Sequence, residues 1–330
     1  MRVLVVTNMY PTEQFPALGT FVRDQVEALR RKGVEIVVLP IIGKKKDKVK
    51  YLKGVAKVLF AVSTSRYDLV HAHYVFSGVL ARLQFKYPVL VSFHGAGEME
   101  GWQGQLCKIL SPFVDGMTVT SQRHKSQLGN EGAHIVPCGV DFAVFKPMPQ
   151  EAVRLELGLP ADKKLVLFAA DMRPEKRYDI ARDAVSLLKA GGEDVELVTV
   201  TGKPHSVVPK YMNACDALVL PSEYEGSPVV IKEAMACNLP IVAADVGDVA
   251  EVIGQTDGCY ICQRTPSDVA EKLMAALDRG CRTDGRTAVA HLQIDQLADK
   301  MIQIYGEVIE SKRARWDQFR RARSSDLLNR

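Results

Sequence analysis

Several features that mark particular classes of protein are scarce or missing in this chain. Basic residues exceed acidic ones by only four charges, so the composition indicates no general affinity for nucleic acid. No apolar stretch approaches the ~20 residues that a membrane-spanning helix needs. Met1-Arg2 is followed by a short apolar run that polar residues soon end, unlike a secretory signal. We therefore expect a cytoplasmic protein.

Cysteine usage also argues against several kinds of site. The seven cysteines are odd in number and scattered, which is typical of reduced thiols. Cys259 and Cys262 form a lone C-x-x-C in an apolar, strand-like run, whereas a zinc site needs a second pair and a redox motif needs a helix after the first cysteine. His71 and His73 have no third ligand nearby. We therefore expect no metal and no cofactor.

The glycine pattern of dinucleotide-binding enzymes, G-x-G-x-x-G, is missing after the first expected strand. That strand is followed by Asn8-Met9-Tyr10-Pro11, and the first glycine is Gly19. An oxidoreductase that uses a nicotinamide cofactor is therefore disfavoured.

Strand and helix patterns alternate along the 330 residues, which predicts an α/β protein of about two domains with parallel sheets. Strands are expected at 2–7, 35–39, 69–73, 89–93, 117–120 and 134–136, and then at 164–169, 195–200, 217–220, 240–243 and 259–261. Helices are expected at 20–32, 180–189 and 295–315, the last followed by a charged tail. The stretch 139–147 carries no clear period and is the candidate linker.

The most informative run is residues 225–233, Glu-Gly-Ser-Pro-Val-Val-Ile-Lys-Glu, between an expected strand and an expected helix. Ser227 is expected to cap this helix, with Pro228 at its first position. Asn238 stands where a helix often ends in the left-handed conformation. The sequence therefore predicts a well-defined helix start immediately after a strand.

Two carboxylates, Glu225 and Glu233, flank this predicted helix start. The free amides and positive dipole end of a helix N-terminus form an anion site. Glu233 lies about five residues into the helix, roughly 7 Å along its axis, which matches the reach from a phosphate to a neighbouring ribose. This constellation suits a sugar–diphosphate–nucleoside.

These residues resemble a known family, the retaining glycosyltransferases of family 4, which have the GT-B architecture. The run at 225–247, EGSPVVIKEAMACNLPIVAADVG, is similar to the family's signature. Further matches occur in order at Gly19-Thr20-Phe21, His71-Ala72-His73-Tyr74, Phe93-His94-Gly95, Gly139-Val140-Asp141 and Arg173-Pro174-Glu175-Lys176. The resemblance covers nearly the whole chain.

The resemblance implies two Rossmann-like domains that face each other across a cleft, where ligands bind at the carboxyl ends of the strands. Residues 1–147 would form the acceptor-side domain and 148–311 the donor-side domain. Residues 312–330 would be a C-terminal helix or tail that returns to the first domain. The implied activity is transfer of a hexose from a UDP- or GDP-linked sugar to a carbohydrate or lipid-linked acceptor. The anomeric configuration would be retained without a metal, in cell-envelope polysaccharide or glycolipid synthesis.

The same resemblance implies roles for individual residues. Glu233 would hold the ribose hydroxyls, Lys176 would face the diphosphate, and His94 would touch the donor sugar or the reacting edge. Glu225 would contact the donor sugar, helped by the backbone of Gly226, Ser227, Pro228 and Val229. Gly19 would let the first loop pass close to the phosphates.

The chain also departs from the family's pattern. The arginine usual five residues before Lys176 is Asp171 here, and Arg173 is expected to take over its role. The aspartate usual two residues after Gly95 is Gly97, which is followed by Glu98. The usual asparagine before Gly139 is Cys138, and the stretch 201–211 is too short to place the usual base-binding loop.

Structural alternatives exist for each of these residues. Lys176 could be a surface lysine, Glu233 a solvent-facing glutamate, and Glu225 a group that only favours the helix dipole. His94 could be a structural histidine. Two rival functions also stay open: a nucleotide-sugar epimerase or hydrolase of the same architecture, and a non-catalytic nucleotide-sugar binder.

Basic residues gather in two clusters, at Lys44–Lys53 and at Lys312–Arg323. Each is either a solvated face or a docking patch for an anionic membrane or acceptor. Apolar residues with helix-like spacing follow the first cluster, among them Leu52, Val55 and Leu59. Peripheral contact through Lys44–Lys53 with the inner face of a membrane is therefore a hypothesis.

Overall fold

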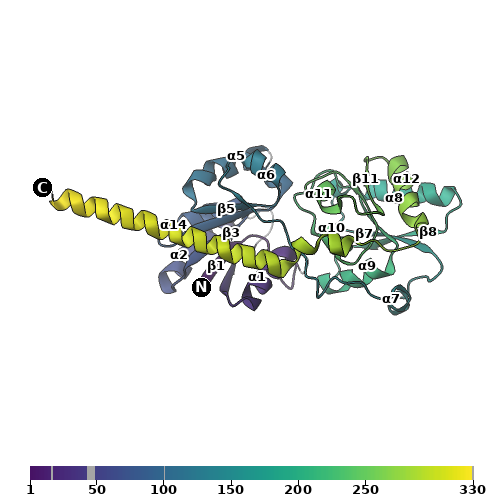
Figure 1. The fold of residues 1–330 in the computed structure, drawn as a ribbon, viewed down its shortest axis with the longest axis horizontal. Helices are drawn as coiled ribbons and strands as arrows, with labels where there is room; N and C mark the ends of the chain where they lie inside the picture. The colour runs from purple at the N-terminus through teal and green to yellow at the C-terminus, as the bar shows by residue number, and fades with distance from the viewer. Residues whose placement is uncertain (16–17, 43–48, 100, 329–330) are drawn as a thin grey trace. The chain divides into compact units, whose positions relative to one another are not determined.

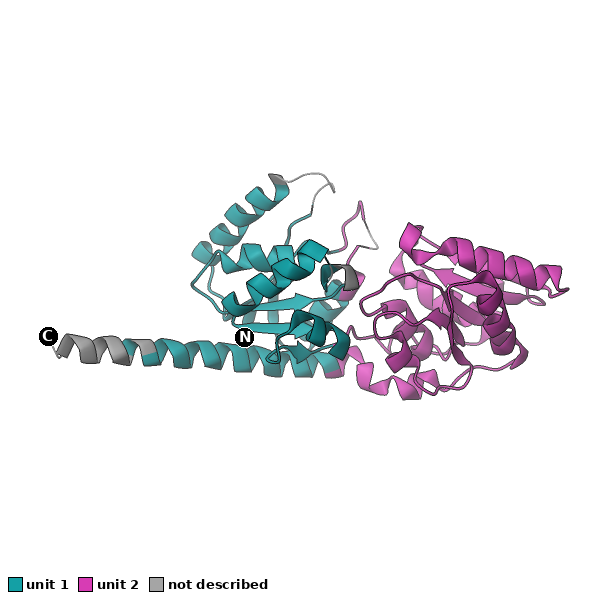
Figure 2. Ribbon diagram, turned by 90° about the horizontal axis from the view of Figure 1, so that it is seen from above, with its two compact units in different colours: residues 1–10, 22–136, 297–330 teal, residues 11–21, 137–296 magenta. Residues whose placement is uncertain are grey.

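The structure, a computed structural model, describes residues 1–15, 18–42, 49–99 and 101–328, with the backbone alone at 49, 96, 97, 319 and 321–328. Internal packing divides the chain into two units (Figure 1, Figure 2). Unit 1 consists of residues 1–10, 22–136 and 297–330, and unit 2 of residues 11–21 and 137–296. These divisions fall at 136 and 296, whereas the sequence suggested domain boundaries at 147 and 311. Each unit holds one parallel sheet with helices around it, so the predicted α/β class is confirmed.

Unit 1 is built on a parallel sheet in the order β2-β1-β3-β4-β5-β6. Its strands are β1 (Arg2–Thr7), β2 (Glu35–Pro40), β3 (Leu69–His73), β4 (Val89–Phe93), β5 (Gly116–Val119) and β6 (His134–Ile135). Runs such as Val89-Leu90-Val91 are apolar on consecutive positions because both faces of this sheet are covered. The expected strands of this half are confirmed to within a residue or so.

Helices follow the strands of this sheet along the chain. They are α1 (Thr20–Arg31), α2 (Val49–Thr64), α3 (Val75–Arg82), α4 (Ala96–Met99), α5 (Gly101–Leu110) and α6 (Gln122–Leu128), with a 3-10 turn at Ser111–Phe113. Helix α1 buries Val22, Val26 and Leu29, as its spacing predicts, and Gly33 follows it with a φ of +84°. The amphipathic period therefore places this helix correctly.

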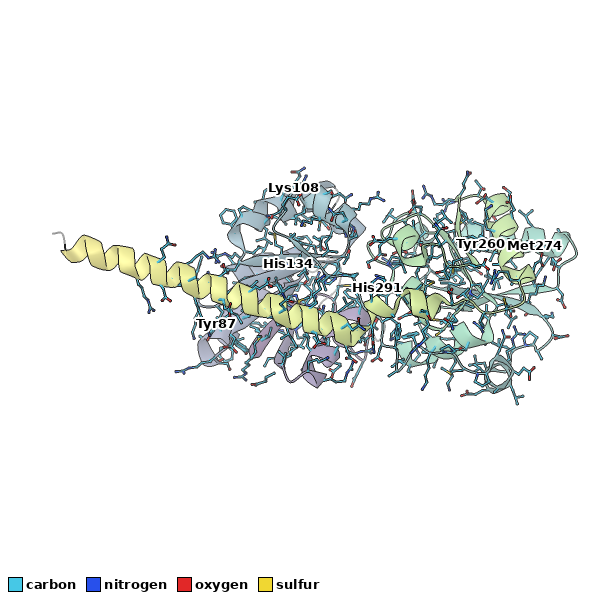
Figure 3. All side chains as sticks on the ribbon, viewed as in Figure 1. Tyr87, Lys108, His134, Tyr260, Met274 and His291 are labelled. Carbon is cyan, nitrogen blue, oxygen red and sulfur yellow. The ribbon has the colours of Figure 1, made fainter. Side chains whose placement is uncertain are left out.

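The last helix, α14 (Ile294–Leu328), belongs to unit 1 from Leu297 onward, and the buried side chains that the structure describes in that part lie between Leu297 and Ile309 (Figure 1, Figure 2). Tyr305 of this helix is fully buried. Val308 fills the space beside Gly116, because a Cβ added at Gly116 would lie 2.5 Å from Cγ2 of Val308. His134 of β6, labelled in Figure 3, lies 3.7 Å from Glu307. The expected helix at 295–315 is correct and continues to Leu328 through charged residues, many of them good helix formers. The segment expected at 312–330 as a helix or tail is thus helical as far as Leu328, and it belongs to unit 1 as expected.

Unit 2 contains a parallel sheet in the order β11-β10-β9-β7-β8. Its strands are β7 (Lys164–Ala169), β8 (Val195–Val200), β9 (Ala217–Leu220), β10 (Ile241–Ala244) and β11 (Cys259–Cys262). Its helices are α7 (Gln150–Leu157), α8 (Tyr178–Ala190), α9 (Val208–Ala214), α10 (Val229–Ala236), α11 (Val249–Ile253), α12 (Pro266–Asp278) and α13 (Gly285–Ala288). Three 3-10 turns lie at Pro174–Lys176, His205–Val207 and Ala290–Leu292.

Two hydrophobic clusters cover the two faces of this second sheet. Leu165 and Leu167 of β7 belong to the cluster that includes α9 and α10 residues, whereas Val166 and Phe168 belong to the one that includes α8 and α12 residues. This alternation is the two-residue period of a strand. Cys259 packs against the first cluster and Cys262 lies in the second, so the C-x-x-C pair is split between the two faces.

The candidate linker is not a free connection. Residues 139–147 have no regular helix or strand, as expected, but Val140 forms a bridge with Gln293, and both Val140 and Phe145 are buried in the core of unit 2. Elsewhere in the described chain, none of the helices combines the length and apolar character that a bilayer crossing requires.

Candidate active site

Two predicted donor-side residues, Lys176 and Glu225, and two residues that the sequence did not single out, Asp248 and His205, follow the carboxyl ends of neighbouring strands in unit 2. Lys176 follows β7, Glu225 follows β9 and Asp248 follows β10, and His205 follows β8. Because β7 pairs with both β8 and β9, and β9 with β10, parallel topology brings these loops to one edge of the sheet.

Lys176 and Glu225 form an ion pair with each other. The family resemblance predicts that Lys176 faces the diphosphate and that Glu225 contacts the donor sugar. Nζ of Lys176 lies 2.5 Å from Oε1 of Glu225, and their side chains are only 13% and 12% exposed. The two loops are also joined through the backbone, because the amide of Glu223 donates to the carbonyl of Glu175 at 2.8 Å. The sheet order thus places a cation beside a carboxylate at a partly enclosed position.

Arg173 has different partners. Its side chain is more than half exposed and lies 2.9 Å from Glu175 and 3.9 Å from Asp171. The structure therefore does not bring Arg173 into the Lys176–Glu225 pair, and its role at the phosphates stays a prediction. Exposed pairs of this kind contribute little to stability.

The start of α10 differs from the prediction. The helix begins at Val229, with Pro228 in the capping position and no side-chain cap. The predicted cap at Ser227 is wrong, because its hydroxyl instead donates to Oδ2 of Asp248 at 2.6 Å. The end of the helix agrees with the prediction, because Asn238 adopts the expected left-handed conformation with a φ of +57°.

Ser227 is held by a buried lysine that the sequence analysis missed. The Lys232 ammonium is completely buried, donates to Oγ of Ser227, and lies 2.8 Å from Oδ2 of Asp248. A buried ammonium requires a carboxylate partner, and that requirement explains why the serine turns away from the helix amides. A lysine inside an amphipathic pattern carries no signal of its own, so only the tertiary fold reveals this cluster.

Gly247 allows a close approach of two loops at the same place. Its φ is +61°, and an added Cβ would overlap the carbonyl oxygen of Gly226 and lie 2.9 Å from that of Glu225. A side chain here would displace the Glu225-Gly226 backbone. The glycine thus helps to fix the predicted sugar-binding segment.

Glu233 is not a solvent-facing helix residue. It is 4% exposed, and its Oε1 lies 2.6 Å from Nε2 of His205. His205 comes from the short 201–211 segment, which the sequence analysis could not place, and its ring lies 5.3 Å from that of buried Phe145. The structure excludes the solvent-exposed alternative, although the ribose contact itself stays a prediction.

Unit 1 holds a network of buried histidines at the carboxyl ends of β3 and β4. Nε2 of His94 lies 2.8 Å from Nδ1 of His73 and their rings are stacked, whereas the rings of His71 and His73 lie 4.2 Å apart and are tilted by 37°. His71 also bonds Tyr305 at 2.8 Å and Ser92 at 2.7 Å. Burial lowers the pKa of His71 and His94 to about 3 and that of His73 well below its usual value, so these imidazoles are neutral at physiological pH.

Glu98 organises the segment around His94. It is buried, accepts a hydrogen bond from the amide of His94 at 3.0 Å, and accepts another from the amide of Val75. Burial raises the pKa of Glu98 to about 7, against the effect of these bonds. Tyr74, which directly precedes Val75, adopts a φ of +70° and a ψ of 153°. This conformation costs about 1–3 kcal/mol for a residue other than glycine. The carboxyl therefore ties a strained turn to His94.

Gly19 precedes α1, is buried and has a φ of +64°, a conformation that favours glycine. Its contact with phosphates stays a prediction. Among the described residues, no group of three or more histidine, cysteine, aspartate or glutamate side chains is arranged to hold a metal ion.

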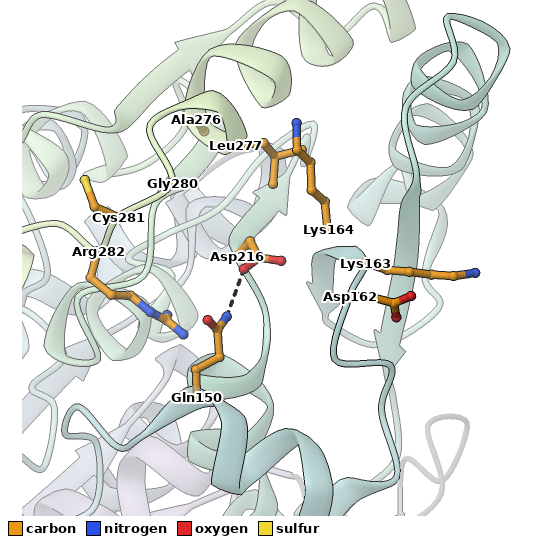
Figure 4. Close-up of a pocket in the computed structure, with 10 residues that line it drawn as sticks. All are labelled: Gln150, Asp162, Lys163, Lys164, Asp216, Ala276, Leu277, Gly280, Cys281 and Arg282. Atoms are coloured by element: carbon orange, nitrogen blue, oxygen red, sulfur yellow. Dashed lines mark hydrogen bonds between the residues drawn. The ribbon is translucent and has the colours of Figure 1, made fainter.

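A separate polar hollow in unit 2 lies around Asp216 (Figure 4). Its carboxylate accepts hydrogen bonds from Gln150 at 2.8 Å, from Arg154 at 2.8 Å and from the amide of Leu165 at 2.6 Å. None of the predicted site residues lines this hollow. Asp216 therefore has a structural explanation, as the connection between α7, β7 and the start of β9.

The fold and these strand-end loops define a GT-B protein of two Rossmann-like units. The solved sucrose-phosphate synthase of Thermosynechococcus elongatus covers 94% of this chain and all of its own at a TM-score of 0.77 and 19% identity. HepE of Anabaena, solved with UDP-glucose, covers 93% of this chain and all of its own at a TM-score of 0.71 and 15% identity. These likenesses show the fold.

Sequence comparison identifies the family. Residues 2–144 match the model of "Glycosyltransferase Family 4" and residues 188–279 that of "Glycosyl transferases group 1", together well over half of the chain. The chain belongs to the family 4 glycosyltransferases and is an enzyme of that class.

Curated relatives agree with this membership. TuaC of Bacillus subtilis, a glycosyltransferase named for teichuronic acid biosynthesis, is 24% identical over 83% of this chain and 88% of its own. A D-inositol 3-phosphate glycosyltransferase of Arthrobacter sp. is 28% identical over 69% of this chain and 67% of its own length.

The buried Lys232–Asp248 pair makes a prediction about stability. Lys232→Met should destabilise the protein by about 3–5 kcal/mol, because it leaves the Asp248 carboxylate buried without its counter-charge. Urea denaturation followed by circular dichroism measures this. As a matched control, Lys272→Met removes a half-buried lysine paired with exposed Glu271 and should cost less than about 1 kcal/mol. Equal effects of the two substitutions would contradict the proposed importance of the buried pair.

Glu98 makes a prediction about pH. Between pH 4.5 and about 7 the folded protein keeps the Glu98 proton that the unfolded chain releases, so this group lowers stability as pH rises through that window. Glu98→Gln removes the titration, so its stability relative to wild type should rise by about 3 kcal/mol across the window. The buried histidines act in the opposite direction in both proteins and cancel. Parallel stability curves of the two proteins would show that Glu98 does not titrate there.

Proposed function

We propose that this glycosyltransferase moves a hexose from a UDP- or GDP-linked sugar to an acceptor hydroxyl, with retention of the anomeric configuration and without a metal ion. The acceptor would be a carbohydrate or a lipid-linked carbohydrate, in cell-envelope polysaccharide or glycolipid synthesis. The observation that carries the proposal is the joint placement of Lys176, Glu225 and Glu233 around the start of α10.

The chemistry explains why these residue types belong together. As the sugar–diphosphate bond breaks, negative charge builds on the leaving diphosphate, and a fixed cation stabilises that charge more in the transition state than in the ground state. Lys176 supplies the cation and the first-turn amides of α10 supply aligned dipoles. A bound diphosphate competes with Glu225 for Lys176, and it thereby releases that carboxylate to accept hydrogen bonds from the donor sugar. Departure and attack would occur on the same face, with the diphosphate as base toward the acceptor hydroxyl.

Named relatives support parts of this proposal. HepE was solved with UDP, with UDP and glucose, and with UDP-glucose, which supports a UDP-linked hexose donor. TuaC is named for teichuronic acid biosynthesis, which supports a biosynthetic role. A thermal-shift screen of UDP, GDP, ADP and dTDP would identify the base, and NMR of the product would identify the anomer. Donor hydrolysis or epimerisation without acceptor would instead favour the rival enzyme, and tight binding without turnover the non-catalytic binder.

The donor site makes a prediction about turnover. Lys176→Ala and Glu233→Ala should each lower kcat/KM for the donor by about 10²-fold or more, because one loses charge stabilisation of the leaving group and the other the ribose contact. Radiolabelled donor turnover measures this, with circular dichroism to confirm folding. Lys163→Ala serves as a control, since that lysine is bound to Glu196. Wild-type turnover by both well-folded variants would overturn the site assignment.

The membrane hypothesis gains support from α2. Lys44, Lys45, Lys46 and Lys48 lie outside the described residues, but α2 follows them directly. This helix buries Val58 and Val62, while Leu52 is 73% and Phe60 70% exposed. Lys53 and Lys57 are exposed beside them, so the outer face combines apolar and basic side chains. This composition suits the surface of an anionic bilayer. In the second basic cluster, by contrast, Lys312 and Arg315 pair with Asp115.

The α2 face makes a prediction about vesicle binding. The wild-type protein should co-sediment with vesicles that contain phosphatidylglycerol and much less with phosphatidylcholine alone. Leu52→Gln with Phe60→Gln should reduce this binding by about tenfold or more, since each buried apolar side chain contributes roughly 1.5–3 kcal/mol. Leu155→Gln, at an 84% exposed leucine of α7 in unit 2, should change nothing. Co-sedimentation unaffected by the α2 double substitution, or by neutralising Lys44–Lys50, would refute membrane docking through this face.

A further inference from the structure

The hydrogen bond between His205 and Glu233 joins two side chains that are distant in sequence and nearly enclosed. Nε2 of His205 and Oε1 of Glu233 are 2.6 Å apart, and the side chains are 17% and 6% exposed. A hydrogen bond to a charged group at this distance is among the stronger ones in proteins. The rotamer of the Glu233 carboxylate is therefore set by a residue outside its own helix.

His205 is itself held in place. It begins the 3-10 turn His205–Val207, which runs directly into α9 (Val208–Ala214). Its ring lies 5.3 Å from that of Phe145, which is fully buried in the core of unit 2. The imidazole is thus positioned by the end of β8, by α9 and by the 139–147 segment. A rigid donor of this kind holds its acceptor at little further cost in entropy.

We propose that His205 is a positioning residue that orients the Glu233 carboxylate toward the ribose hydroxyls of the nucleotide. This inference rests on the proposed function and extends it to the nucleoside part of the donor. A carboxylate can accept about four hydrogen bonds. Glu233 can therefore keep its bond to His205 while it accepts bonds from a ribose diol. An unoriented carboxylate would have to give up rotamer freedom at each binding event.

The proposal also accounts for the short 201–211 segment. His205 reaches Glu233 from the loop after β8, at the same edge of the sheet as Lys176 and Glu225. The segment therefore brings one specific side chain to the nucleoside end of the site. Its contribution should be visible only when the ligand carries ribose hydroxyls.

The experiment compares UDP and GDP with their 2′,3′-dideoxy forms by isothermal titration. Wild type, His205→Ala, His205→Gln and Lys210→Ala are measured, the last as a control on α9 whose lysine pairs with exposed Glu156. Of UDP and GDP, the one that binds the wild-type protein more tightly is used for the comparison. His205→Ala should weaken its binding by about 10- to 100-fold, the range for a hydrogen bond to a charged group. The dideoxynucleotide should bind all four proteins with nearly the same affinity. His205→Gln, which keeps an N–H donor, should recover part of the loss.

The outcomes separate this inference from the proposed function. Equal losses for ribonucleotide and dideoxynucleotide would show a merely structural role for His205 and overturn the inference. An unchanged ribonucleotide affinity in a folded His205→Ala protein would overturn it as well. Failure of the wild-type protein to bind any of the nucleotides would instead overturn the proposed function, and the inference with it.

Discussion

Unit 2 of this glycosyltransferase depends on one buried ion pair, between Lys232 and Asp248. The pair lies directly behind the start of α10, and Ser227 completes it. Because an unpaired charge at this depth is costly, the loop after β10 and the first turns of α10 are held together. Gly247 then allows that loop to lie against the Glu225-Gly226 backbone. The carboxylates on either side of the helix start are consequently fixed relative to each other.

In unit 1, neutral groups rather than an ion pair hold the side chains at the strand ends in place. A fully buried imidazole cannot hold a charge cheaply, so the histidines at the ends of β3 and β4 exchange hydrogen bonds among themselves and with hydroxyl groups. His94 is consequently suited to hydrogen bonding, as its contact with His73 shows. Glu98 adds a buried carboxyl at this edge, and its burial raises its pKa to about 7.

Most strands could be predicted because buried parallel strands are short, continuous apolar runs, such as residues 165–169 of β7. The glycosyltransferase family could be predicted because Glu225, Gly226 and Glu233 keep fixed spacing around a strand-to-helix turn. Ser227 was misassigned for a physical reason. A serine before a proline and a helix is a good cap by local rules, but a buried lysine five residues later competes for its hydroxyl.

The amino-acid sequence alone determined the α/β class, the family and the positions of the main candidate residues, because each of these depends on local spacing and composition. Only the tertiary structure decided which partners these residues have. His205 and Glu233, or Lys176 and Glu225, meet because parallel strands distant in sequence end at one edge of a sheet. The burial that shifts the pKa of Glu98 and neutralises the histidines likewise arises from packing of whole elements, which no short segment of sequence contains.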